Sequence, residues 1–170
     1  LALLSNAVDQ LAQQNIRLMA NCPDVIRLCT DKAKTFEKLA TQQIRIPRTR
    51  VVRDEADIAF VGLPCIIKPA TGSGGSVMVF YAQDLSEAAM YAEYIKRMGG
   101  CPIAQEYLVN SEGEFTVGVL SMPDTTIVGS IALKRNLDNK LSVQSNSRGG
   151  LVSSGYTQGY IGDFPQICSQ

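Results

Sequence analysis

Ile66-Ile67-Lys68-Pro69 leads directly into Ala70-Thr71-Gly72-Ser73-Gly74-Gly75-Ser76, so that an apolar run ends on a lysine just before a glycine-rich loop. Glycine has no Cβ, and such a loop therefore brings main-chain N–H groups close to a bulky anion at little steric cost. The lysine adds a compact cation beside the same anion. The pattern is neither a P-loop nor a dinucleotide fingerprint, because no Gly-Lys-Ser/Thr follows it and the next run, Val77–Tyr81, is strand-like. Taken alone, the segment is equally consistent with a plain hairpin loop.

The segments around the loop mix strands and helices. Helical spacing begins near Val8 and Leu11, and Thr30 or Asp31 caps a second helix that has Phe36 on its apolar side. Further helices follow Asp54 and Asp84. Strands are expected at 1–4, 48–53, 65–68, 77–81, 102–105, 115–120 and 126–133, a turn at 136–139, irregular loop at 142–162, and a helix opening at 164–165. This order predicts an α+β protein of two lobes.

The composition excludes several classes of protein. The chain has 170 residues, of which 45% are hydrophobic, and its sixteen basic and sixteen acidic residues leave no net charge. We therefore expect a packed core and no nucleic-acid partner. The chain contains no His, which excludes Ser-His-Asp, Cys-His and His-zinc chemistry. The five cysteines are scattered without a CxxC pair, so free thiols and a cytoplasmic location are expected, and no run is long enough to span a membrane.

A second informative segment is Gln105-Glu106-Tyr107-Leu108, followed by Glu114-Phe115-Thr116-Val117. An extended stretch between two lobes offers main-chain N–H and C=O groups to the edge of an adenine, and Leu108 offers an apolar wall. A carboxylate at Glu114 is suited to accept hydrogen bonds from ribose hydroxyls. Taken singly, each of these acids is more simply a solvated surface group.

The order of these motifs resembles the ATP-grasp ligases, especially the carbamoyl-phosphate-synthase-like and D-alanine–D-alanine-ligase-like branches. The match covers roughly residues 25–135 and runs from Asp31-Lys32 through Gly62-Leu63-Pro64-Cys65, the glycine loop and the two segments above. The resemblance implies an ATP-grasp fold whose large lobe lacks its C-terminal part. It divides the chain into 1–30, the end of a preceding domain with a linker helix; 31–109, the small lobe with the helix that leads into it; and 110–170, an incomplete large lobe.

The resemblance also implies a role for individual residues. Lys32 corresponds to the first basic contact to the phosphates of ATP and Lys68 to the second. Gly72, Ser73, Gly74, Gly75 and Ser76 correspond to the mobile loop over the triphosphate. Gln105, Glu106, Tyr107 and Leu108 form the adenine-reading hinge, in which Glu106 accepts from the exocyclic amine, and Glu114 binds the ribose. Lys134 and Arg135 are candidate catalytic residues near phosphate or acyl substrate, although a solvated basic turn explains them equally well.

The sequence departs from the family at the metal site. The family holds Mg²⁺ with acidic residues and an Asn on later strands, whereas Asp163 is the only acid after Ser142. We therefore expect no metal ligands in this chain and Mg²⁺ only in a full-length protein. The predicted function is the ATP-binding portion of an ATP-dependent carboxylate–amine (or related) ligase that works through an acylphosphate on a small carboxylate, with this chain alone inactive. The alternatives are a non-catalytic nucleotide sensor derived from the same fold and a structural piece without a ligand.

Overall fold

The computed structural model describes residues 3, 6–18, 20–72, 78–109, 113–135, 143–145, 151–153, 159–161, 164 and 167. The chain divides into two compact units. The first comprises Leu1–Ser73 with Met78–Tyr107, and the second comprises Gly74–Val77 with Leu108–Gln170. Helices and strands both contribute, as the predicted α+β class requires.

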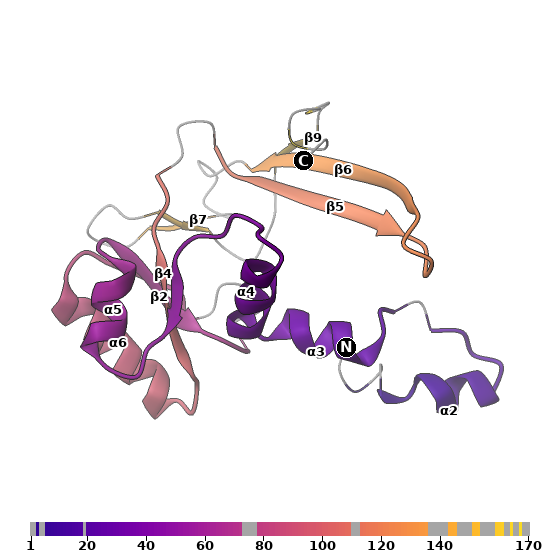
Figure 1. Cartoon of the computed structure of the whole chain (residues 1–170), viewed down its shortest axis with the longest axis horizontal. Coiled ribbons are helices and arrows are strands. Elements are labelled where there is room, and N and C mark those ends of the chain that lie inside the picture. Colours follow the sequence, from indigo (N-terminus) through magenta and orange to yellow (C-terminus); the bar gives the residue numbers. More distant parts are fainter. Residues whose placement is uncertain are drawn as a thin grey trace. The chain divides into compact units, whose positions relative to one another are not determined.

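A four-stranded antiparallel sheet organises the first unit. Its strands are β1 (Thr49–Val51), β2 (Cys65–Pro69), β3 (Phe80–Ala82) and β4 (Pro102–Glu106), in the spatial order β1-β4-β2-β3. Helices α5 (Glu55–Val61) and α6 (Leu85–Arg97) lie on one side of this sheet, and α4 (Lys32–Thr41) lies on the other (Figure 1). The sheet therefore has one face against α5 and α6 and a second face toward α4.

The core of the unit lies between the sheet and α6. Cys65 and Ile67 alternate along β2 toward this side and are fully buried. On α6, Ala88, Ala92 and Ile95 recur at helical spacing and are buried against them. Each large aliphatic side chain buried in this way contributes about 1.5–3 kcal/mol, so this layer holds the sheet in place.

In the described part of the chain, α2 (Val8–Gln13), α3 (Pro23–Thr30) and α4 precede the sheet. The Asp31 side chain accepts a hydrogen bond from the Lys34 N–H and caps α4, which confirms the predicted start of that helix. The strand expected at residues 1–4 is wrong at Leu3, which is helical and 88% exposed. A run of four apolar residues is too short for its periodicity to distinguish a strand from a helix. Residues 1, 2 and 4 lie outside the described part of the chain.

The second unit is built on a long antiparallel ribbon. Strands β5 (Phe115–Ser121) and β6 (Ile127–Arg135) pair from Phe115↔Lys134 to Ser121↔Ile127, with a register shift between Leu120 and Ser121, and β9 (Gly159–Ile161) adds to β6. The Met122 N–H donates to the Thr126 carbonyl at 2.9 Å and closes the turn between the two long strands. The strands at 115–120 and 126–133 are confirmed.

The irregular loop expected at 142–162 is corrected by three short strands. Strand β7 (Val143–Ser145) pairs with β8 (Leu151–Ser153), and β9 pairs with β6 in the register Leu133↔Ile161. The Ser- and Gly-rich composition favours loops, but strand pairing overrides this local preference: β7 and β8 pair with each other, and β9 pairs with β6, which is more distant in sequence. The turn expected at 136–139 lies outside the described residues. The helix expected near 164 is observed at Ile167, whose N–H donates to the Phe164 carbonyl.

Across the described part of the chain, no helix has both the length and the apolar character needed to cross a membrane.

The cap of α6 gives a test of the fold. The Asp84 carboxylate accepts from the Glu87 N–H at 2.8 Å, so Asp84→Ala leaves this N–H without its partner. We expect the free energy of unfolding to fall by about 1 kcal/mol in urea titrations, whereas Asp84→Asn, which retains a capping oxygen, changes it by only a few tenths. Equal losses in both variants would contradict the capping role.

Candidate functional site

The sheet face toward α4 carries the candidate site. Gln105 on β4 lies directly opposite Thr49 on β1 and Ile66 on β2. Directly opposed residues of an antiparallel pair point to the same face, and residues two apart on a strand share it. Thr49, Gln105 and Lys68 therefore lie on one face, and Ile67 lies on the opposite, buried face.

The Lys68 ammonium is held by hydrogen bonds and by an aromatic ring. Its Nζ donates to Gln105 Oε1 at 2.7 Å, and the Gln105 amide nitrogen donates to Thr49 Oγ1 at 3.0 Å. Thr49 Oγ1 in turn donates to the Pro47 carbonyl at 2.9 Å. From α4, the Phe36 ring stands 5.7 Å from Lys68 Nζ, within the range of a cation–π contact.

A main-chain hydrogen bond places Lys32 close to the end of β2, where Lys68 lies. The Lys32 N–H donates to the carbonyl of Ala70 at 2.8 Å, which ties the first residue of α4 to the chain just beyond β2. Lys32 and Phe36 are four residues apart and therefore share one side of α4. Two lysines and one aromatic ring thus meet at the end of β2.

This arrangement lowers the pKa of both lysines. Burial, and secondarily the charge of Lys32, lowers the pKa of Lys68 from its ordinary 10.5 to about 8. Burial also lowers the pKa of Lys32, while the nearby Asp31 carboxylate opposes that shift. Partly desolvated cations that repel each other favour a bound anion, because the anion stabilises both charged forms.

Glu106 points away from this face. It opposes Cys65 on β2, and its carboxylate accepts from the Arg48 guanidinium at 2.9 Å and from the Arg48 N–H at 3.1 Å. These hydrogen bonds lower the pKa of Glu106, and the one from the Arg48 side chain has the larger effect. The consecutive hinge residues Gln105 and Glu106 therefore have side chains on opposite faces, each already bound to a protein partner.

The rest of the hinge continues past the sheet. The Tyr107 ring makes an edge contact with Tyr81 of β3, with ring centroids 4.9 Å apart, and Leu108 is 59% exposed. Leu108 is therefore accessible from solvent.

In the second unit, Glu114 is paired with Arg135. The Arg135 guanidinium donates to the Glu114 carboxylate, and the Arg135 N–H donates to the Glu114 carbonyl at 2.7 Å. Lys134 is exposed and its Nζ lies 5.7 Å from the centre of the Phe115 ring. A Cβ at Gly113 would lie 2.8 Å from Lys134 Cε, so glycine permits the close approach of this lysine.

The structure thus brings Lys32, Lys68 and Gln105 together in the first unit, and Glu114 and Arg135 together in the second. Ser73, Gly74, Gly75 and Ser76 lie outside the described residues, whereas Gly72 has the positive φ of +73° that glycine tolerates. Sequence reasoning missed the site partners Thr49, Phe36 and Arg48. Strand alternation across 48–53 signals which side chains share a face, but the pairing of β1 with β4 is needed to use that signal.

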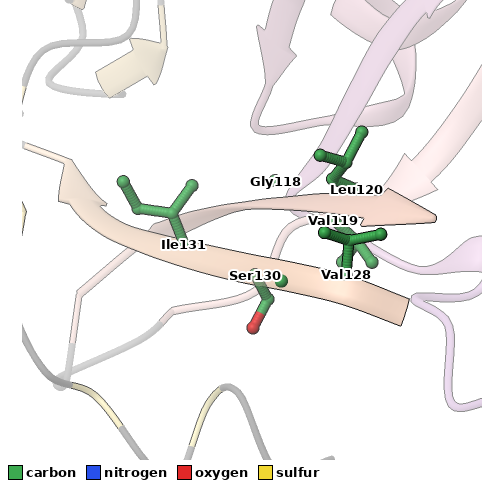
Figure 2. A pocket seen from close by; sticks show the side chains of 7 residues that line it. Gly118, Val119, Leu120, Val128, Ser130 and Ile131 are labelled. Atoms are coloured by element: carbon green, nitrogen blue, oxygen red, sulfur yellow. The ribbon is translucent and has the colours of Figure 1, made fainter. Parts of the chain in front are cut away.

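The pocket along the ribbon is a different feature. It has a volume of about 510 Å³, is lined by residues 118–120 and 128–131, and includes none of the predicted site residues (Figure 2). Its wall is mainly aliphatic, and Ser130 contributes a hydroxyl. In the described part of the chain, no three acidic or cysteine side chains gather into a group that could hold a metal ion.

Removing the Lys68 charge should stabilise the first unit at neutral pH. Because its pKa is about 8 in the folded chain and 10.5 ordinarily, the unfolded chain binds more protons between these pH values, and stability rises across that window. We expect Lys68→Met to be more stable than the parent at pH 7, by up to about 3 kcal/mol, and the advantage to shrink by pH 10. Denaturation curves at both pH values measure it. The control Lys38→Met, at an exposed position of α4, should alter neither curve.

Comparison with known proteins shows to which family the chain belongs. The model of the ATP-grasp domain matches residues 29–154. The formate-dependent phosphoribosylglycinamide formyltransferase of Cronobacter sakazakii is 28% identical over 131 residues, which are 72% of this chain and 33% of that protein. That of Klebsiella pneumoniae is 32% identical over 97 residues, or 52% of this chain and 25% of that protein. The chain spans about a third or less of these relatives.

Solved structures agree in fold. D-alanine–D-alanine ligase from Bacillus anthracis superposes with a TM-score of 0.65 at 16% identity, over 94% of this chain and 50% of the other. N5-carboxyaminoimidazole synthase from Aspergillus clavatus, in complex with ADP and an aminoimidazole ribonucleotide, gives 0.57 at 17% identity, over 78% and 35%. At such identities the likeness concerns the fold alone. The family match over most of the chain confirms the resemblance seen in its motifs: the chain belongs to the ATP-grasp domain family.

Proposed function

We propose that the chain binds ATP as part of an ATP-dependent ligase. Lys32 and Lys68 bind the phosphates, the loop at 72–76 covers the triphosphate, the hinge at 105–108 reads adenine, and Glu114 binds the ribose. The observation that carries the proposal is the partly buried Lys68 ammonium, which has a neutral amide as acceptor and a second cation as neighbour.

The physical argument concerns charge. Holding two ammonium groups near each other in a partly desolvated place is unfavourable unless an anion binds there. Phosphate oxygens accept charge-assisted hydrogen bonds, which are about twice as strong as neutral ones. Because the Glu106 carboxylate is bound to Arg48, we propose that its contact to the adenine amine comes from its main-chain carbonyl.

The proposed reaction transfers a phosphoryl group first. A substrate carboxylate oxygen attacks the γ-phosphorus of ATP, the bond to the β-phosphate oxygen breaks, and ADP leaves. An amine nitrogen, or a related nucleophile, then attacks the acyl carbon, inorganic phosphate leaves with its oxygen, and the amine proton passes to solvent. Lys32, Lys68 and the loop provide charge stabilisation and exclude water. Lys134 and Arg135 are proposed to meet phosphate or acyl substrate. Mg²⁺ is proposed to accompany ATP in a full-length protein.

The relatives support a small carboxylate as substrate. The name of the curated relatives refers to formate, which is a carboxylate. Since the chain spans only about a third of the curated relatives, the identity of the carboxylate and of the nucleophile belongs to the whole protein. We propose a cytoplasmic location and no nucleic-acid partner, in line with the free thiols and the balanced charge of the sequence.

Nucleotide titration tests the binding proposal. We expect the 170-residue chain to bind ADP weakly by calorimetry, and Lys32→Ala or Lys68→Ala to weaken binding by about ten- to a hundredfold, because each removes a charge-assisted hydrogen bond. Glu114→Ala should also weaken it. The control Lys38→Ala keeps the parent affinity, and circular dichroism checks that each variant is folded. If no variant differs from the parent, the chain is a structural piece in which the glycine loop is only a turn.

The chain by itself should not turn ATP over. Phosphoryl transfer needs its developing charge neutralised, and Asp163 is the only acid after Ser142, where the family carries its metal ligands. A coupled assay for ADP should therefore stay at the background rate with ATP and Mg²⁺ present. ATP-dependent release of ADP by the purified chain would contradict this expectation.

A further inference from the structure

The hydrogen-bond partner of Lys68 is neutral. The acceptor of its Nζ is the Gln105 amide oxygen at 2.7 Å, and the charge that acts on Lys68 is the like charge of Lys32. On the same sheet face, β1 presents Thr49 and β3 presents Tyr81, which opposes Ile66. A carboxylate in the place of the amide would cancel the charge of the ammonium, whereas an amide fixes its position and leaves the charge intact.

The orientation of the amide is determined by its other neighbour. A threonine hydroxyl has one proton, and that of Thr49 is given to the Pro47 carbonyl at 2.9 Å. Thr49 Oγ1 therefore only accepts toward Gln105, and the group that faces it must be the amide NH₂, at 3.0 Å. The amide oxygen consequently points to Lys68, which has donors only. Each hydrogen bond in this series therefore has only one possible donor: Lys68 donates to Gln105, Gln105 donates to Thr49, and Thr49 donates to the Pro47 carbonyl.

We propose that Gln105 is a positioning residue, whose amide oxygen holds the Lys68 ammonium ready for an anion without neutralising it, and that Thr49 fixes the orientation of that amide. This inference rests on the proposed function for the identity of the anion, a nucleotide phosphate. The role proposed for Gln105 is therefore a contact with Lys68, in place of the contact with adenine that the resemblance implies.

The first experiment measures Lys68 in the free chain and needs no nucleotide. Side-chain NMR of labelled lysine follows the Lys68 pKa in the parent, Gln105→Met and Gln105→Glu. Gln105→Met removes the acceptor and should lower the pKa of Lys68 further, and Gln105→Glu adds a negative charge and should raise it. Gln42→Met, at an exposed glutamine just after α4, should leave it unchanged. A pKa of Lys68 that is the same in the parent, Gln105→Met and Gln105→Glu overturns the proposal.

The orientation is tested separately with Thr49→Val, which keeps the β-branched shape and removes the hydroxyl. Without that hydroxyl the amide is no longer fixed, and the pKa of Lys68 should shift in the same direction as in Gln105→Met. Thr41→Val, whose hydroxyl bonds only within the end of α4, serves as the matched control. A Thr49→Val chain with the parent pKa at Lys68 overturns the part of the proposal that concerns Thr49.

The second readout is the affinity for ADP. Gln105→Met and Gln105→Glu should each weaken binding about tenfold, although they shift the pKa of Lys68 in opposite directions, because one misplaces the cation and the other neutralises it. If the parent and Lys68→Ala bind ADP equally, the proposed function fails while the pKa measurement still tests the role of Gln105. If Lys68→Ala loses binding and both Gln105 variants keep it, the positioning role alone is overturned.

Discussion

The candidate site of the first unit depends on the partly buried Lys68 ammonium, for which the described residues provide a neutral acceptor and no carboxylate within ion-pair distance. Among the described residues, the Lys68 ammonium contacts the Gln105 amide oxygen and the face of the Phe36 ring. Each of these stabilises a cation less than a carboxylate does. Burial and the charge of Lys32 therefore disfavour the charged form of Lys68 at the end of β2, and the anionic ligand that we propose would stabilise it. Such a trade of stability for binding is common where proteins position charged groups for function.

The two faces of the four-stranded sheet carry different side chains, because successive residues of a strand point to opposite faces. The face against α6 is filled with small and branched apolar side chains and supplies the packing energy. The face toward α4 carries the polar row from Thr49 to Gln105 and on to Lys68. Glu106, one residue further along β4, falls on the other side and is bound by Arg48. A single-residue shift in the register of β4 would exchange these roles.

Several elements of the fold and of the candidate site could be predicted from the local sequence. The pair of strands after Glu114 follows from periodicity and is found as predicted. Of the two predicted caps, Thr30 and Asp31, the structure selects Asp31, and the strand predicted to end on Lys68 extends to Pro69. Phe36 was predicted on the apolar side of its helix, but its contact with Lys68 is a tertiary one. The partners Thr49 and Arg48 depend on the pairing of β1 with β4, 56 and 58 residues apart in sequence, which no local pattern encodes. Strand β9 was not predicted for the same reason, because it pairs with β6. Strands β7 and β8 pair locally, but the Ser- and Gly-rich composition around them favoured a loop.

Ala70 has both of its main-chain groups engaged: its N–H donates to the Cys101 carbonyl and its carbonyl accepts from Lys32, each at 2.8 Å. These two hydrogen bonds hold the main chain at Lys32 next to the main chain just beyond Lys68 in the absence of a ligand. A backbone that is already held in place loses less conformational entropy when a ligand binds to it.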